Sequence, residues 1–404
     1  MKKIILSTVA VMSIAAAVSA ADVSADSVEN ALKDGKFTMD ARVFYFDRSF
    51  DTSGKDNVTS LTAGGIMKYT TKKYMGLTAG LAYYSSNSIA GLYSKQDGAG
   101  SNNLTSDGDN INILGEAYLQ YDRGNSMLKV GRQKLDTPLM NNHDLRTIAT
   151  SYEAAIVKNK DIPGTEVELG YVWAFTDLGS NLNDFSDNES AWGDKGLAYV
   201  LVKNNSIKEL KIKAQYVKTV SDEYELVGAD TDIDITDYKY ADVSYAIPFG
   251  KSTYVKAQYG GNAYNTGDDS TMVGAKTGTT LGMFDVAVLY NQIQDNEFKA
   301  VEAGPMYSDW QQGYGNYEPS TAFGGQVTVK PMDDLSVKAG YVDVSADEDS
   351  VKDDYTEINI DANYKINNIS KVRVRYSMKD QSSKSEDAGA EDRNDFRVIY
   401  YVSF

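Results

Sequence analysis

The sequence contains no cysteine and only one histidine, His143. Disulfide bonds and metal sites built on thiolates are therefore excluded. A zinc site with several histidines is excluded too, and a serine–histidine–aspartate triad could use only His143. We accordingly predict no metal, no cofactor and no enzymatic activity. The formal net charge of −17 would repel phosphates, so the sequence also argues against nucleic acid as a partner.

Long apolar runs are also lacking, apart from one at the N-terminus. Ile4–Val18 follows Lys2 and Lys3, and the small residues Ser19 and Ala20 close the run. This pattern is typical of a signal peptide, so we predict that residues 1–20 are removed. Cleavage one residue later and an uncleaved anchor are the alternatives. No other segment reaches the roughly 18 apolar residues that a membrane helix needs.

What the sequence has instead is alternation of apolar and polar residues. In Thr165–Phe175, Tyr355–Tyr364 and Lys371–Lys379, the two kinds of residue occupy opposite faces of a two-residue period, which indicates β-strands. A soluble β-sandwich alternates in the same way, so the period alone does not separate it from a membrane barrel.

The connections between the predicted strands favour the membrane barrel. Outer-membrane barrels have short periplasmic turns and long external loops. Here short connections fall near residues 71–74, 123–125, 159–163, 248–250, 331–334 and 367–370, and long ones near 86–109, 137–150, 176–195, 294–320 and 381–393. The chain also stops on an apolar strand face, made of Phe396, Val398, Tyr400, Val402 and Phe404. A soluble protein has no reason to end on such a face.

We therefore predict an all-β fold, a transmembrane antiparallel β-barrel of about 18 strands over residues 37–404. Residues 21–36 are predicted to form a short periplasmic segment, in which Asp26–Lys36 has the pattern of one short helix. A barrel of this size is wide enough to leave an aqueous channel. The predicted location is the bacterial outer membrane.

Strand parity predicts which side chains line the lumen. If the apolar faces meet lipid, then Lys371, Arg373 and Arg375 point inward from one strand and Arg397 from the next, and with Arg42 they would form a basic ladder that attracts anions and carboxylates. These basic residues either set the ion selectivity of the channel or are merely solvated residues that keep the lumen hydrated. The same parity places further charged residues inside, namely Lys211, Lys213, Lys256, Glu116, Glu166, Glu168, Asp285, Glu357 and Asp361.

The connection Thr137–Thr150, with the sequence TPLMNNHDLRTIAT, is less acidic and more apolar than the other long ones. An apolar loop has a reason to fold inward and narrow the pore, so we prefer this prediction to an ordinary external loop. Asp136 and Thr137 would anchor its start, and Asp144 and Arg146 would face the passage. The candidate constriction residues are Asp136, Thr137, Pro138, His143, Asp144 and Arg146.

Two stretches resemble a known family. Val130–Ala154 is similar to the third-loop region of the OprD-type specific porins, with the family pattern carried by Leu135, Thr137, Pro138, Asp144, Arg146, Tyr152 and Glu153. Ala31–Asp51 is similar to the start of OprD-like porins of Campylobacter-type bacteria. Thr147-Ile148-Ala149 departs from the family, whose members often carry a proline after the loop arginine.

The resemblance implies an 18-stranded barrel, monomeric or in loose trimers, with an inward third loop and a wall of arginines that steers carboxylate-bearing solutes. The major porin of Campylobacter-type bacteria, a trimer of the same broad architecture, is a related possibility. Asp144 and Arg146 match the family's loop motif, whereas the ladder residues rest on strand parity alone.

The predicted function is a passive diffusion channel for small hydrophilic solutes, with a preference for carboxylates or anions. Its other expected partners are outer-membrane lipid and lipopolysaccharide. A structural or adhesin barrel with little or no open pore is the alternative, and single-channel conductance separates the two. The acidic clusters at 347–354 and 230–234 could bind calcium, but they lack EF-hand spacing, so solvated loop charge is the preferred interpretation.

Overall fold

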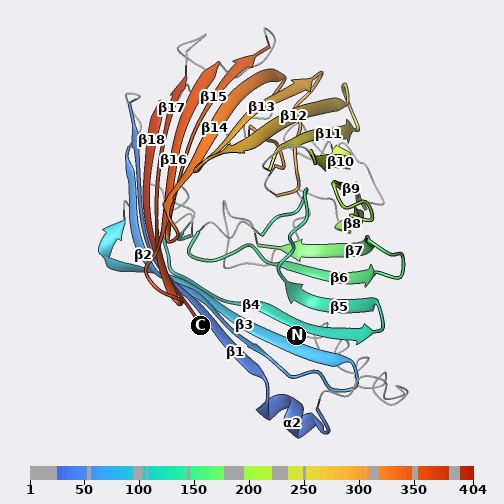
Figure 1. Ribbon diagram of the computed structural model, residues 1–404. Coiled ribbons are helices and arrows are strands. Elements are labelled where there is room, and N and C mark those ends of the chain that lie inside the picture. Colours follow the sequence, from blue (N-terminus) through green and yellow to red (C-terminus); the bar gives the residue numbers. More distant parts are fainter. Residues whose placement is uncertain are drawn as a thin grey trace.

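A computed structural model describes residues 25–51, 56–93, 103–105, 108–142, 146–176, 195–220, 235–248, 252–302, 304–308, 318–347, 354–381 and 392–404. The predicted signal peptide lies outside these residues. An 18-stranded antiparallel sheet closes on itself into a barrel, which confirms the predicted fold (Figure 1). The strands are β1 (Lys36–Phe50), β2 (Val58–Thr70), β3 (Leu77–Tyr93), β4 (Ile111–Arg123), β5 (Ser126–Gln133), β6 (Tyr152–Asn159), β7 (Thr165–Phe175), β8 (Leu197–Asn204), β9 (Leu210–Thr219), β10 (Ile235–Ala246), β11 (Tyr254–Tyr264), β12 (Ser270–Leu281), β13 (Phe284–Gln294), β14 (Ser320–Met332), β15 (Leu335–Ala346), β16 (Tyr355–Lys365), β17 (Ser370–Gln381) and β18 (Arg393–Ser403).

Each strand pairs with its neighbours in the sequence, and β1 closes the ring by pairing with both β2 and β18. At the closure, Val43 lies opposite Tyr400 of β18 on one side and Ala63 of β2 on the other. Because no strand has a free edge, every backbone group within the sheet can be satisfied in a lipid environment. Short turns join the strands at one end; Gly124 and Gly282 adopt positive φ angles of 54° and 64° there, which a tight hairpin turn requires.

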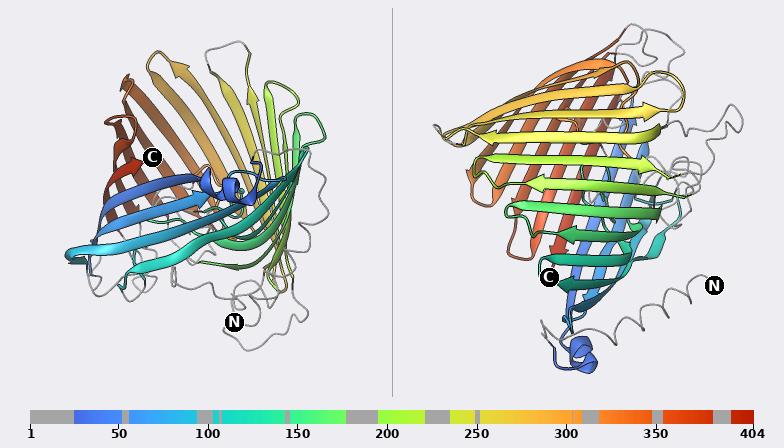
Figure 2. Two further views of the ribbon diagram at one scale, coloured as in Figure 1. Left: turned by 90° about the horizontal axis from the view of Figure 1, so that it is seen from below. Right: turned by 90° about the vertical axis from the view of Figure 1, so that its right-hand side faces the viewer.

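A short helix, α2 (Val28–Lys33), precedes the barrel. The Ser27 hydroxyl caps it by accepting a hydrogen bond from the Asn30 amide at 3.1 Å, and the helix ends near Gly35 because β1 begins at Lys36. The Lys72 amide donates to the Ala31 carbonyl at 3.0 Å, which ties α2 to the β2–β3 turn. Figure 2 shows α2 beyond the end of β1. Among the described residues, no helix has the length and apolar character to cross a membrane.

The two faces of the wall alternate along every strand. In β1, Phe44 is fully buried whereas the neighbouring Val43 is 40% exposed, and in β18 Arg397 is buried whereas Phe396 is 39% exposed. The exposed members are the outward apolar residues that meet lipid in an outer-membrane barrel, and the buried members point into the barrel. The apolar/polar period of the sequence therefore does separate the outside of this barrel from its inside.

Candidate pore constriction

The connection between β5 and β6, residues 134–151, folds into the barrel. We call it the constriction loop; its described parts, 134–142 and 146–151, lie inside the ring of strands (Figure 1). Leu135, Leu139 and Met140 are buried among inward-facing apolar residues of strands from β6 to β13. The Leu139 amide donates to Gln215 Oε1 at 2.9 Å, and Gln215 Nε2 donates to Thr137 Oγ1 at 3.0 Å. This side of the loop is therefore held on β9.

The other end of the constriction loop is held on a different wall. Ile148 and Ala149 are fully buried in a cluster with inward-facing residues of β2, β3 and β4. The hydroxyls of Thr147 and Thr62, on β2, lie 2.7 Å apart, and the Thr147 amide donates to Asn103 Oδ1 at 3.0 Å. Since β2 and β9 are far apart in the ring, the loop crosses the lumen.

The sequence-predicted loop residues occupy distinct places. Thr137 is buried, and its hydroxyl contacts the Met140 carbonyl at 3.1 Å across a turn that contains Pro138. Asp136 is exposed, and Arg146 offers its backbone carbonyl to Arg42 Nη1 at 2.5 Å. His143 and Asp144 lie outside the described residues.

A second connection also enters the barrel, and here the sequence prediction was wrong. Residues 294–320 were expected to be a long polar external loop, but Phe298 and Met306 are buried against the apolar cluster that receives Leu139. The backbones of the two loops pair: the Asn141 amide donates to the Glu302 carbonyl and the Glu302 amide to the Leu139 carbonyl, each at 3.1 Å. Burial of these apolar side chains outweighs the polar character of the rest of the connection.

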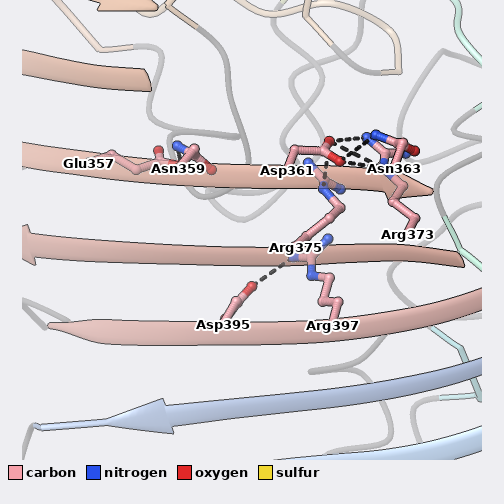
Figure 3. Close-up of polar contacts among 8 residues, drawn as sticks. All are labelled: Glu357, Asn359, Asp361, Asn363, Arg373, Arg375, Asp395 and Arg397. Carbon is pink, nitrogen blue, oxygen red and sulfur yellow. Dashed lines mark hydrogen bonds and ion pairs between the residues drawn. The ribbon is translucent and has the colours of Figure 1, made fainter. Parts of the chain in front are cut away.

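The basic residues gather on one wall, made by β17, β18 and β1. We call this the arginine wall; it consists of Arg42, Arg48, Arg373, Arg375, Arg393 and Arg397. In Figure 3, Asp361 of β16 lies between Arg373 and Arg375 of β17. Arg373 donates Nε to Asp361 Oδ1 at 2.9 Å, and Arg375 Nε lies 3.5 Å from Asp361 Oδ2. Lys371 lies at the start of the same strand, with its ammonium 4.5 Å from the Tyr401 ring centroid.

A buried carboxylate, Asp395, organises the centre of the arginine wall. Arg48 of β1 donates Nε and Nη2 to its two oxygens at 2.6 and 2.8 Å, and Arg397 donates Nη2 to Oδ2 at 2.7 Å. Asp395 is fully buried and Arg397 is 2% exposed. Arg48, Arg393 and Asp395 were missed at the sequence level, although each has the inward parity of Arg42 or Arg397.

The constriction loop brings one more cation to this wall. The backbone carbonyl of Arg146 accepts a hydrogen bond from Arg42 Nη1 at 2.5 Å, which holds this part of the loop against the wall. A guanidinium stays protonated in proteins, so Arg146 adds a positive charge to this region. Seven guanidinium groups of the described residues thus gather in this region, and two carboxylates, Asp361 and Asp395, are each shared by two of them.

Three of the predicted acidic residues of the lumen, Glu116, Glu166 and Glu168, form ion pairs with nearby lysines. Glu116 accepts from Lys68 Nζ at 2.7 Å, and Glu168 from Lys158 Nζ at 2.6 Å and from the Tyr199 hydroxyl at 2.6 Å. Glu166 lies 2.9 Å from Lys160 and 3.5 Å from Lys203. Glu357 is buried on β16 and accepts from Asn359 at 2.6 Å. The lysines therefore balance the charge of Glu116, Glu166 and Glu168.

The family described as outer membrane porin, OprD family, matches residues 29–318, which is more than half of the sequence. The chain belongs to the OprD family. This membership places the barrel in the bacterial outer membrane and makes it a channel rather than an enzyme. No curated protein has a sequence that matches this OprD-family chain.

Solved structures share the fold of this OprD-family porin. OccK3 (OpdO) of Pseudomonas aeruginosa has a TM-score of 0.70 at 16% identity, with 93% of this chain and 97% of that chain covered. OpdK of Pseudomonas aeruginosa, solved with vanillate, has a TM-score of 0.74 at 16% identity, covering 92% and 99%. OccAB3 of Acinetobacter baumannii has a TM-score of 0.75 at 14% identity, covering 92% and 99%.

Proposed function

We propose that this porin is a passive diffusion channel for small hydrophilic solutes that favours anions, and carboxylates in particular. The observation that carries the proposal is the gathering of guanidinium groups where Arg146 of the constriction loop meets the arginine wall, with Asp361 and Asp395 each shared by two arginines. An uncompensated positive charge in a confined passage raises the local concentration of anions and repels cations. No energy source is needed, because the solute moves down its own gradient.

Guanidinium chemistry supports carboxylates as the preferred class. A planar guanidinium presents a fork of donors that matches the two oxygens of a carboxylate, and Arg48 already binds Asp395 in this way. The aromatic faces of Phe46 and Tyr401 lie 5.1 and 5.2 Å from the Arg397 and Arg42 guanidinium carbons. The presence of vanillate, an aromatic carboxylate, in the OpdK structure is in keeping with this preference.

The constriction loop would set the width of the passage. The loop crosses the lumen because it is anchored on β9 and on β2. Backbone hydrogen bonds with Glu302, in the connection between β13 and β14, hold it at a third point. In this proposal Thr137 and Pro138 fix the start of the loop, and Asp136, His143, Asp144 and Arg146 border the passage.

Other features of the porin extend the proposal. The outward apolar faces would contact outer-membrane lipid, with lipopolysaccharide around the external rim, and the barrel would act as a monomer or a homotrimer. The similarity of Ala31–Asp51 to Campylobacter-type porins supports placing the chain in that branch of the family. Residues 1–20 would be removed during export.

Reversal potentials in planar bilayers test the proposed selectivity. The wild-type porin should be anion selective in a KCl gradient, and the double variant Arg375→Gln/Arg397→Gln should lower the anion-to-cation permeability ratio about fivefold, because two charges are removed beside the passage. Lys33→Gln/Lys239→Gln removes equal charge from α2 and from an exposed position of β10, and should leave the ratio unchanged. Equal ratios for the wild type and the arginine variant would contradict the proposal, and the absence of any conductance would favour the structural or adhesin role.

A further inference from the structure

Three lysines line the lumen outside the arginine wall, and one of them, Lys338, borders it because its ladder partner Asp361 binds Arg373 and Arg375. Lys256 lies on β11, Lys276 on β12 and Lys338 on β15, each with the parity of inward-facing neighbours such as Gln258, Met272 and Val342, which are buried. Lys256 and Lys338 lie toward the ends of their strands that carry the short turns, which is the periplasmic end of an outer-membrane barrel, and Lys276 lies opposite Lys256. We call this group the lysine station.

The strand register brings these like charges together. Lys256 lies directly opposite Lys276 in the β11–β12 ladder. The Lys276 ammonium reaches Gln326 of β14, which lies opposite Gly340 of β15, and Lys338 is two residues from Gly340 on the same face. Like charges directly opposite each other in a sheet are destabilising, so folding alone gives no reason for this arrangement.

Carboxylates nearby do not neutralise the lysine station. Within the described part of the chain, no ion pair involves any of the three lysines. The Lys276 ammonium instead donates to Gln326 Oε1 at 3.3 Å and lies 5.9 Å from the Tyr307 ring centroid. The Lys256 ammonium lies 5.2 Å from the centroid of the Tyr254 ring.

The carboxylates of this region are engaged elsewhere. Asp242 lies 3.9 Å from Lys213 and accepts from the Tyr240 hydroxyl at 3.3 Å. Asp285 accepts from Thr280 Oγ1 at 2.6 Å, and Asp361, which is opposite Lys338 in the ladder, binds Arg373 and Arg375. By contrast, the lumen lysines Lys68 and Lys158 each have a glutamate within 2.7 Å. The lack of a carboxylate partner thus distinguishes the lysine station from Lys68 and Lys158.

We propose that Lys256, Lys276 and Lys338 form a second anion-binding site, on the periplasmic side of the constriction, that prefers small dianions to monoanions. The inference rests on the proposed anion channel and adds to it a site on β11, β12 and β15, beside the arginine wall of β17, β18 and β1. Ammonium groups are compact, strongly hydrated point charges, so they bind by charge rather than by shape. Weak, charge-based binding lets a solute be drawn through the constriction and still leave.

Phosphate block of the chloride current tests the site. Potassium phosphate at neutral pH is added to either side of a single wild-type channel in KCl, with potassium acetate as the monoanion, and the half-blocking concentrations are compared. Phosphate should block at lower concentration than acetate. The triple variant Lys256→Gln/Lys276→Gln/Lys338→Gln should raise the half-blocking phosphate concentration about tenfold, because three charges close to the ion are lost.

Three control variants show whether a change in the phosphate block comes from the lost charges of the lysine station. The triple Lys→Arg variant at the same positions retains the charges and should retain the block, whereas Lys33→Gln/Lys208→Gln/Lys239→Gln, away from the lysine station, should behave as wild type. Arg375→Gln/Arg397→Gln should lose anion selectivity and yet keep the phosphate block. An unchanged block in the Lys→Gln triple variant overturns the second site even if the arginine variant behaves as expected. A block that vanishes only in the arginine variant overturns it as well, and leaves the proposed function standing.

Discussion

Deletion of Leu139–Thr147 is expected to raise the single-channel conductance several-fold. The removed stretch includes Leu139, held on β9 by Gln215, and Thr147, held on β2 by Thr62, so its loss takes away the segment that crosses the lumen. The strands on either side, β5 and β6, pair along their whole length and do not depend on the loop for register. The measurement is conductance in symmetrical KCl for refolded protein in planar bilayers.

A deletion of the same length elsewhere shows whether the conductance rises because the pore widens or only because the chain is shorter. Removal of residues 382–390, from the connection between β17 and β18, shortens the protein by the same amount at a loop predicted to be external. It should leave the conductance close to that of the wild type. The variant Leu139→Asn/Met140→Asn keeps the loop length but places amides in the apolar cluster, and it should give a higher and noisier conductance. If all three variants conduct like the wild type, the loop does not narrow the pore.

Replacement of Asp395 by alanine is expected to lower the free energy of unfolding by about 3–5 kcal/mol, since breaking one partner of a buried ion pair leaves uncompensated charge behind. Asp395 is fully buried and neutralises both Arg48 and Arg397, which would then face each other across the closure between β1 and β18. Urea unfolding of the barrel refolded in lipid vesicles, followed by tryptophan fluorescence, gives the change.

The exposed ion pair between Lys160 and Glu166 provides the control. Its 2.9 Å separation is similar, but the Lys160 side chain is 62% exposed, so Lys160→Ala should cost only about 0–1 kcal/mol. Asp395→Glu keeps the negative charge and should recover part of the lost stability. A loss for Asp395→Ala no greater than that for Lys160→Ala would show that the arginine wall does not depend on its central carboxylate.

The fold could be predicted from the sequence because the two-residue period carries it directly. Strand β7 occupies the predicted range Thr165–Phe175, and the strand count of 18 agrees with the prediction. A barrel in lipid must present apolar residues outward along every strand, so each strand shows the alternation by itself and can be recognised without the others. The predicted helix at Asp26–Lys36 is shorter in the structure because β1 already begins at Lys36.

The interior could be predicted only in part. Parity gives the face on which Arg397 lies, but the partner that it binds depends on the register between strands and on the loops that reach it. Its partner Asp395 is two residues away on the same face, whereas the other partner of Asp395, Arg48, is 347 residues from Asp395 in the chain. The inward course of residues 295–308 was missed because only Phe298, Met306 and a few neighbours signal it within a polar connection.

The arginine wall is built from both ends of the polypeptide. Arg42 and Arg48 come from the first strand, and Asp395 and Arg397 from the last, so the ion pair between Arg48 and Asp395 cannot form until β1 and β18 meet. The pairing that closes the barrel during assembly is thus the same event that completes the surface proposed to select anions. A barrel that stopped before β1 and β18 paired would lack both a closed wall and a complete arginine wall. Assembly would therefore not produce an open barrel that is closed to lipid but lacks the proposed anion selectivity.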